Sequence, residues 1–61
     1  MKARDLRELS AEALTARLAT EQAEAATLRE AIRAGKEKNH AALKAKRVDI
    51  ARIKTIMREK L

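Results

Sequence analysis

Hydrophobic positions in the first half of the chain recur at alternating steps of three and four, the spacing of one face of an α-helix. The positions on this face are Leu14, Leu18, Glu21, Ala25, Leu28 and Ile32. Glu21 and Ala25 weaken the middle of the stripe because neither adds a large apolar side chain. Ser10 can cap the start of the helix, so the pattern predicts a helix over residues 11–34.

A second apolar stripe predicts a helix over residues 40–60. Its main positions are Leu43, Ile50, Ile53 and Met57. Asn39 is a good cap for the start of this helix. Gly35 follows the first helix, where a residue that tolerates positive φ is needed. Residues 35–39 are therefore expected to form the turn between the two helices.

The predicted fold class is all-α, an antiparallel two-helix hairpin, because so short a turn brings the second helix back along the first. The composition agrees, with no proline, one glycine and many residues that favour helix. Sixty-one residues are too few for more than one domain, so residues 1–61 are expected to form a single helical hairpin.

Two groups of apolar residues remain outside the seam where the two apolar stripes are expected to meet. Leu6 and Leu9 precede the first helix, in a lead-in that we expect to fold against the helix or against a partner. Neither predicted helix has a second layer behind it. Val48, Ile56 and Leu61 are therefore expected to stay exposed or to meet another surface.

The charge of the chain is unevenly distributed, because all six units of net positive charge lie in the second half. Residues 35–61 hold nine Lys or Arg against three Asp or Glu, whereas residues 1–34 hold six of each. A basic half joined to a neutral half suggests a surface for a polyanion and a second surface that holds it in place. Nucleic acid is the polyanion that we expect.

The basic residues of the second predicted helix form a ribbon beside its apolar stripe. Four of them fall within about 80° of one another on a helical wheel: Lys44, Arg47, Lys54 and Arg58. Such a ribbon can meet successive phosphates, and Arg52 adds a further guanidinium for bidentate contacts. Lys36 and Lys38 would extend the contact at the turn. The chain has no aromatic residue to stack on bases, so phosphate contacts and shape must dominate.

Other interpretations of the same residues stay open. The basic ribbon could be a solvated face, and the Leu and Ile seams could pair between chains in a protein-interaction or self-associating coiled-coil module without RNA binding. Membrane binding is disfavoured because the basic helix lacks aromatic residues, and no apolar run approaches the length of a membrane span or signal peptide. The chain is interpreted as cytoplasmic.

No residue pattern indicates an enzyme, a cofactor, a metal site or a small-molecule substrate. The chain has no Cys and a single histidine, His40, which is best interpreted as a residue of the turn or first helical turn. Ser10 has no base to activate it, and Glu21 and Glu24 are interpreted as solvated carboxylates.

At three places the chain resembles the protein twenty-nine family of the bacterial large ribosomal subunit. The members of this family are small two-helix proteins. Residues 1–10 resemble the family's start, and residues 49–55 with 57–59 resemble its closing helix. Leu28-Arg29 and then Gly35 match its middle. The resemblance covers the whole chain, and the segment Asp-Ile-Ala-Arg-Ile-Lys-Thr at residues 49–55 carries most of it.

The chain departs from the family pattern in the middle of the first helix. Ala25, Ala26 and Thr27 occupy a stretch where relatives usually place Leu and an aromatic residue, which leaves a thinner seam. Before Asp49 the family often has a basic pair. Here the chain has Arg47 and then Val48, with Lys44 and Lys46 adding charge nearby.

The resemblance implies a structural protein that binds large-subunit ribosomal RNA near the exit of the polypeptide tunnel. It implies as partners a neighbouring ribosomal protein and the nascent-chain factors that dock there. The matched positions that it proposes for RNA contacts are Arg29, Arg47, Arg52, Lys54 and Arg58.

Overall fold

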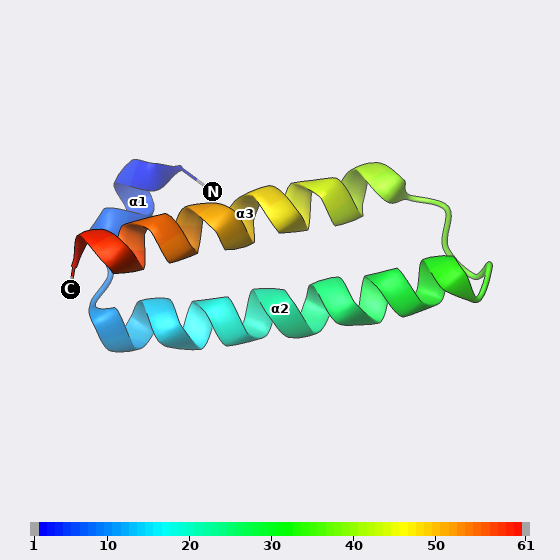
Figure 1. Ribbon diagram of the computed structural model, residues 1–61, viewed down its shortest axis with the longest axis horizontal. Helices are drawn as coiled ribbons and strands as arrows, with labels where there is room; N and C mark the ends of the chain where they lie inside the picture. The colour runs from blue at the N-terminus through cyan, green and yellow to red at the C-terminus, as the bar shows by residue number, and fades with distance from the viewer. Residues whose placement is uncertain (1, 61) are drawn as a thin grey trace.

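The computed structural model describes residues 2–60, which form two long helices and one short one. They are α1 (Ala3–Arg7), α2 (Ala11–Arg33) and α3 (His40–Glu59). Figure 1 shows α2 and α3 lying side by side and antiparallel, with α1 against the C-terminal half of α3. The described residues measure 39 × 17 × 14 Å. The predicted all-α hairpin is confirmed.

Both long helices begin where a polar cap was predicted. The Ser10 Oγ accepts a hydrogen bond from the Ala13 backbone N–H at 3.1 Å. The Asn39 Oδ1 accepts one from the Ala42 backbone N–H at 3.0 Å. Each cap satisfies a backbone donor that the helix itself leaves unpaired. The predicted caps of the two long helices are therefore confirmed.

Gly35 ends α2 in the conformation that the sequence predicted. Its φ is +74°, and the Lys36 N–H donates to the Ala31 carbonyl while the Gly35 N–H donates to the Ile32 carbonyl. This pair of bonds is the Schellman motif, which closes the last turn of a helix. Ala34 caps α2 and Lys60 caps α3, so each helix is one residue shorter than predicted.

Replacing Gly35 with Ala is expected to lower the free energy of unfolding by about 1 kcal/mol, because a Cβ is disfavoured at positive φ. A Cβ built at this position meets no atom within 4 Å, so the cost comes from the backbone alone. Urea unfolding monitored by circular dichroism measures it. Gly35→Asn is the control and should cost less, since Asn tolerates this region of φ. Equal stability of the Ala variant and the parent would contradict the argument.

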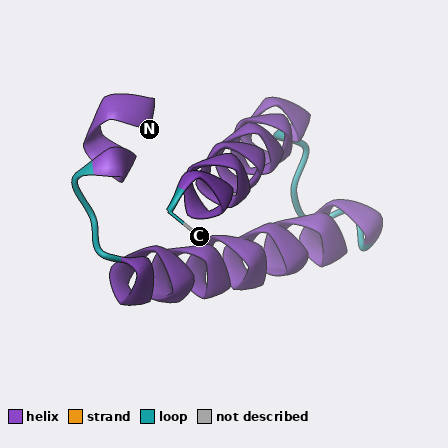
Figure 2. Ribbon diagram, turned by 60° about the vertical axis from the view of Figure 1, so that its left-hand side comes forward, coloured by secondary structure: helices purple, strands orange, loops and turns teal. Residues whose placement is uncertain are grey.

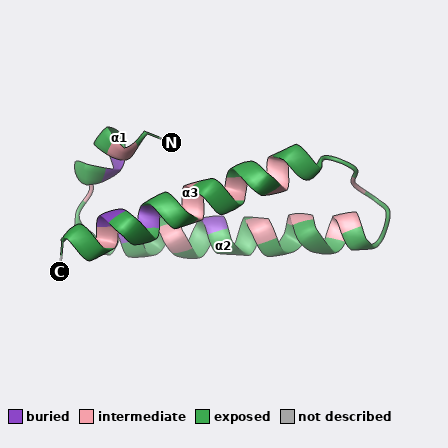
Figure 3. Ribbon diagram, turned by 45° about the horizontal axis from the view of Figure 1, so that its top comes forward, coloured by how far each residue is buried: buried purple, intermediate pink, exposed green. Residues whose placement is uncertain are grey.

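The core lies at the end of the hairpin away from Gly35. Four apolar residues are buried there: Leu6, Leu14, Ile53 and Ile56. Figure 3 shows most of the buried positions gathered where α1 meets the long helices, one further buried stretch midway along α2, and half-buried positions along the rest of the seam. Of the predicted seam, Leu14 and Ile53 are fully buried, Glu21 is buried as well, and the other positions are half-buried. One end of the hairpin is therefore packed more tightly than the turn end.

Ile56 was expected to stay exposed or to meet another surface, and it meets one, since its exposed fraction is 2%. The lead-in supplies the missing layer: α1 packs on α3, and Leu6 joins Ile56 in the same core cluster. Val48 does stay exposed, at 42%. Leu61 lies outside the described residues.

Candidate nucleic-acid interface

Several basic side chains are already paired within the fold. Arg7 donates from Nε and one terminal nitrogen to the two carboxylate oxygens of Glu59, at 3.0 and 3.1 Å. The Lys60 Nζ donates to the Arg7 carbonyl at 3.0 Å. Arg33 pairs with Glu30 within α2. Each of these cations already has a partner in the fold, so they are poorer candidates for binding an external anion than unpaired ones.

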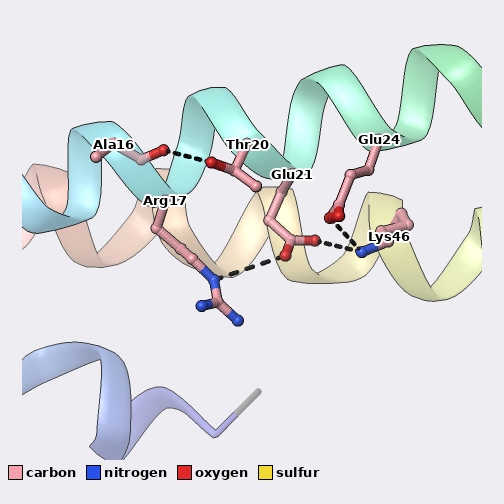
Figure 4. Close-up of polar contacts among 6 residues, drawn as sticks. All are labelled: Ala16, Arg17, Thr20, Glu21, Glu24 and Lys46. Carbon is pink, nitrogen blue, oxygen red and sulfur yellow. Dashed lines mark hydrogen bonds and ion pairs between the residues drawn. The ribbon is translucent and has the colours of Figure 1, made fainter.

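Lys46 is also paired with acidic side chains within the fold. Figure 4 shows its Nζ between two carboxylates of α2, at 3.0 Å from Glu21 and 2.8 Å from Glu24. Glu21 is only 4% exposed, and its second oxygen lies 3.6 Å from the Arg17 Nε. The weak middle of the seam is therefore filled by an ion-pair cluster, and the interpretation of Glu21 and Glu24 as merely solvated was wrong. Lys46 likewise does not supply free charge beside Arg47.

The basic ribbon occupies a side of α3 that neither neighbouring helix covers. Figure 2, seen nearly along α3, shows α1 and α2 on two different sides of it. The ribbon residues are all exposed, and none of their side chains makes an ion pair or hydrogen bond with another described residue. We call them the basic face: Lys44, Arg47, Lys54 and Arg58. Acids pair with Arg7 and Lys46, but within residues 2–60 none pairs with a cation of the basic face.

A shallow groove between α2 and α3 joins the basic face to Arg29. We call it the α2–α3 groove, and its lining residues are Gln22, Ala25, Ala26, Arg29, Leu43, Arg47 and Ile50. Arg29 is exposed and makes no ion pair within the described part of the chain. The structure therefore brings Arg29 and Arg47, from different helices, to one surface.

The remaining predicted residues lie apart from this surface. Arg52 lines a different groove, between α1 and α3, together with Arg7, Val48 and Ile56. It also interacts with another part of the protein. Lys36 and Lys38 are exposed at the turn, beyond the end of α2. Their contact with RNA stays a prediction, as does that of Arg52.

The sequence matches the ribosomal L29 protein family over residues 4–60. This chain belongs to the ribosomal L29 family. Two relatives, each named large ribosomal subunit protein uL29, come from Streptomyces avermitilis and Streptomyces coelicolor. Each is 49% identical over 59 residues, which cover 97% of this chain and 80% of the relative. The resemblance to this family noted in the sequence is confirmed.

Neither a group of metal ligands nor a membrane-spanning helix is found among the described residues of this L29-family protein. Residues 2–60 contain no group of three His, Cys, Asp or Glu placed to hold a metal ion. His40 is exposed at the first position of α3. No helix among the described residues is long and apolar enough to cross a membrane.

Two carboxylates of this L29-family protein have shifted pKa values. The hydrogen bond from Lys46 lowers the pKa of Glu24, and the hydrogen bond from Arg7 lowers the pKa of Glu59. The same contacts raise the pKa of Lys46 and of Arg7. Each pair is favoured when both groups are ionised.

The stability of this L29-family protein is therefore expected to fall in acid. A carboxylate whose folded pKa is lowered stabilises the fold above its unfolded pKa, about 4.3, and loses this contribution as pH falls through the folded pKa. The change should be modest, because Glu24 and Glu59 are exposed and screened. Thermal unfolding at about pH 6 and about pH 3 measures it.

The double variant Glu24→Gln with Glu59→Gln should lose less stability over this pH range than the parent protein. Glu8→Gln is the control, since Glu8 makes no ion pair with another described residue. A double variant with the same pH dependence as the parent would contradict the role of these two pairs.

Proposed function

We propose that this protein is a structural constituent of the large ribosomal subunit and binds ribosomal RNA through the basic face and Arg29. The main support is the separation of its cations into two groups. One group pairs with acids inside the fold, as Lys46 does with Glu21. The other is exposed and has no partner among residues 2–60; its members on α3 form the basic face, and Arg29 lies beside them across the α2–α3 groove. Family membership and the printed names of the two relatives agree with a ribosomal role.

The mechanism is electrostatic and changes no covalent bond. RNA phosphates that meet the basic face release their condensed counterions, and this release drives binding without reading sequence. Arg47 and Arg58 can each hold two phosphate oxygens, while Lys44 and Lys54 act as point charges. Double-stranded RNA buries its base edges in a deep and narrow groove, so a helix without aromatic residues suits its backbone.

The proposal includes a position near the exit of the polypeptide tunnel, beside another ribosomal protein and within reach of nascent-chain factors. This part rests on the family resemblance. The side of α3 opposite the α2–α3 groove leaves room for such a neighbour, because Val48 is exposed there at the rim of the α1–α3 groove.

The packing of the seam disfavours a self-associating coiled coil. Leu14 of α2 and Ile53 of α3 are fully buried within one chain, so they are not available to pair with a second copy. The net charge of +6 would also repel a second copy.

Sedimentation through sucrose tests the proposed function. The protein is expected to migrate with large ribosomal subunits at low salt and to leave them as salt rises, because phosphate contacts weaken with ionic strength. A protein that stays in the ribosome-free fraction at low salt would refute the proposal. A salt-insensitive oligomer without affinity for RNA would instead support the interaction module.

A further inference from the structure

The α2–α3 groove is lined by apolar side chains between its two arginines. We call these side chains the apolar floor: Ala25, Leu43 and Ile50, with Ala26 as its exposed member. The small side chains of α2 leave space beside the seam that larger ones would fill, and Leu43 and Ile50 remain half-buried. The groove holds about 290 Å³.

The ion-pair cluster fixes where the two arginines lie along the groove. Lys46 contacts Glu21, so Arg47 lies near the level of Glu21. Arg29 lies eight residues further along α2, which is roughly 12 Å toward the turn at 1.5 Å per residue. Both guanidinium groups are exposed, and neither pairs with an acid among residues 2–60. The groove therefore has a free cation toward each end.

Phosphates alone do not explain such a groove. A phosphate or a ribose hydroxyl gains nothing from an apolar floor, because it loses water without finding a hydrogen-bond partner. A flat nucleobase gains by covering apolar surface, and arginine planes can stack against it. Bases within a duplex are already stacked, so only an unstacked one is available to fill the groove.

We propose that the α2–α3 groove binds one unstacked nucleotide of ribosomal RNA. Its base lies on the apolar floor, and Arg29 and Arg47 contact the phosphates on its two sides. Gln22 lines the groove beside the floor, and its side-chain amide can donate to and accept from the edge of the base. This inference rests on the proposed function and adds a site of base recognition to a surface that otherwise reads only the backbone.

The α1–α3 groove is less suited to this role. Arg7 at its rim is held by both carboxylate oxygens of Glu59, so its charge is already neutralised. Arg52 on the same rim is also engaged within the protein. Charge complementarity to RNA therefore favours the α2–α3 groove.

Chemical probing of large subunits that lack this protein, before and after it is added back, tests the inference. Hydroxyl radicals report protection of the RNA backbone, and a base-specific reagent reports protection of single bases. Ala26→Leu fills the groove from an exposed position and keeps every arginine. Ala16→Leu makes the same change on the exposed outer side of α2 and is the matched control. Circular dichroism shows whether each variant folds.

One unpaired base is expected to be protected by the parent protein and by Ala16→Leu, but not by Ala26→Leu. The backbone footprint should persist in all three, with affinity about tenfold lower for Ala26→Leu, the size of one lost stacking contact. Gln22→Ala keeps the groove open and should expose only the edge of that base.

The outcomes separate the inference from the proposed function. A backbone footprint without any base whose protection depends on Ala26 and Gln22 would overturn the inference and leave the proposed function standing. Weaker assembly of Ala26→Leu without a change in base reactivity would assign the groove to a protein neighbour and would also overturn it. Absence of any backbone footprint would refute both.

Discussion

The triple variant Arg47→Ala, Lys54→Ala and Arg58→Ala is expected to bind large-subunit RNA with a much flatter salt dependence. Each phosphate contact contributes close to one unit to the slope of log affinity against log salt concentration, so the slope should fall by about two to three units. These side chains make no ion pair in the described part of the fold, and the hairpin should therefore keep its helices. Filter binding at several salt concentrations measures the slope, and circular dichroism checks the fold.

A second triple variant, Lys2→Ala, Arg4→Ala and Arg33→Ala, removes the same charge from other parts of the protein. These three residues are exposed but lie outside α3 and outside the α2–α3 groove. Its slope should stay close to that of the parent protein. If both triple variants flatten the slope equally, only net charge matters and the basic face has no special role.

Replacing Leu14 with Ala is expected to lower the free energy of unfolding by about 3 kcal/mol, through lost burial and the cavity left behind. Leu14 is fully buried in a core of only four residues in the described structure, so few neighbours can move to fill the space. For so small a domain this is a large part of the total stability. The shift in the midpoint of urea unfolding measures the effect.

Val48→Ala is the control for this experiment. Val48 is 42% exposed, so its truncation should change stability by at most about 0.5 kcal/mol. Similar midpoints for the two variants would show that the tight packing at the end of the hairpin away from Gly35 does not stabilise the protein.

The elements of this fold could be predicted from sequence because their limits are set locally. Ser10, Gly35 and Asn39 each act on backbone groups within a few positions, and the structure confirms all three. The burial of Ile56 could not be predicted in the same way. It depends on α1 folding back onto α3, and a five-residue helix has too little periodicity to show where it packs.

The candidate surface was predicted in part. The wheel grouped Lys44, Arg47, Lys54 and Arg58, since helical spacing alone decides which residues share a side. Charge counting could not show that Lys46 is paired, because its partners lie on the other helix. Glu21 gave a sign of this pairing, since a carboxylate on the stripe that begins at Leu14 needs a cation across the seam.

The position of the core has a consequence for the order in which the protein folds. The turn end is loosely packed, while Arg7 and Glu59, 52 positions apart in the chain, meet beside the buried residues. A hairpin of this kind gains little by forming contacts outward from its turn. Its strongest contacts join residues that are far apart in the sequence. Its rate-limiting step should be the closure of a long loop, which makes it a slower folder than helical proteins with local contacts. Residues 53–59 must therefore be synthesised before α1 finds its place.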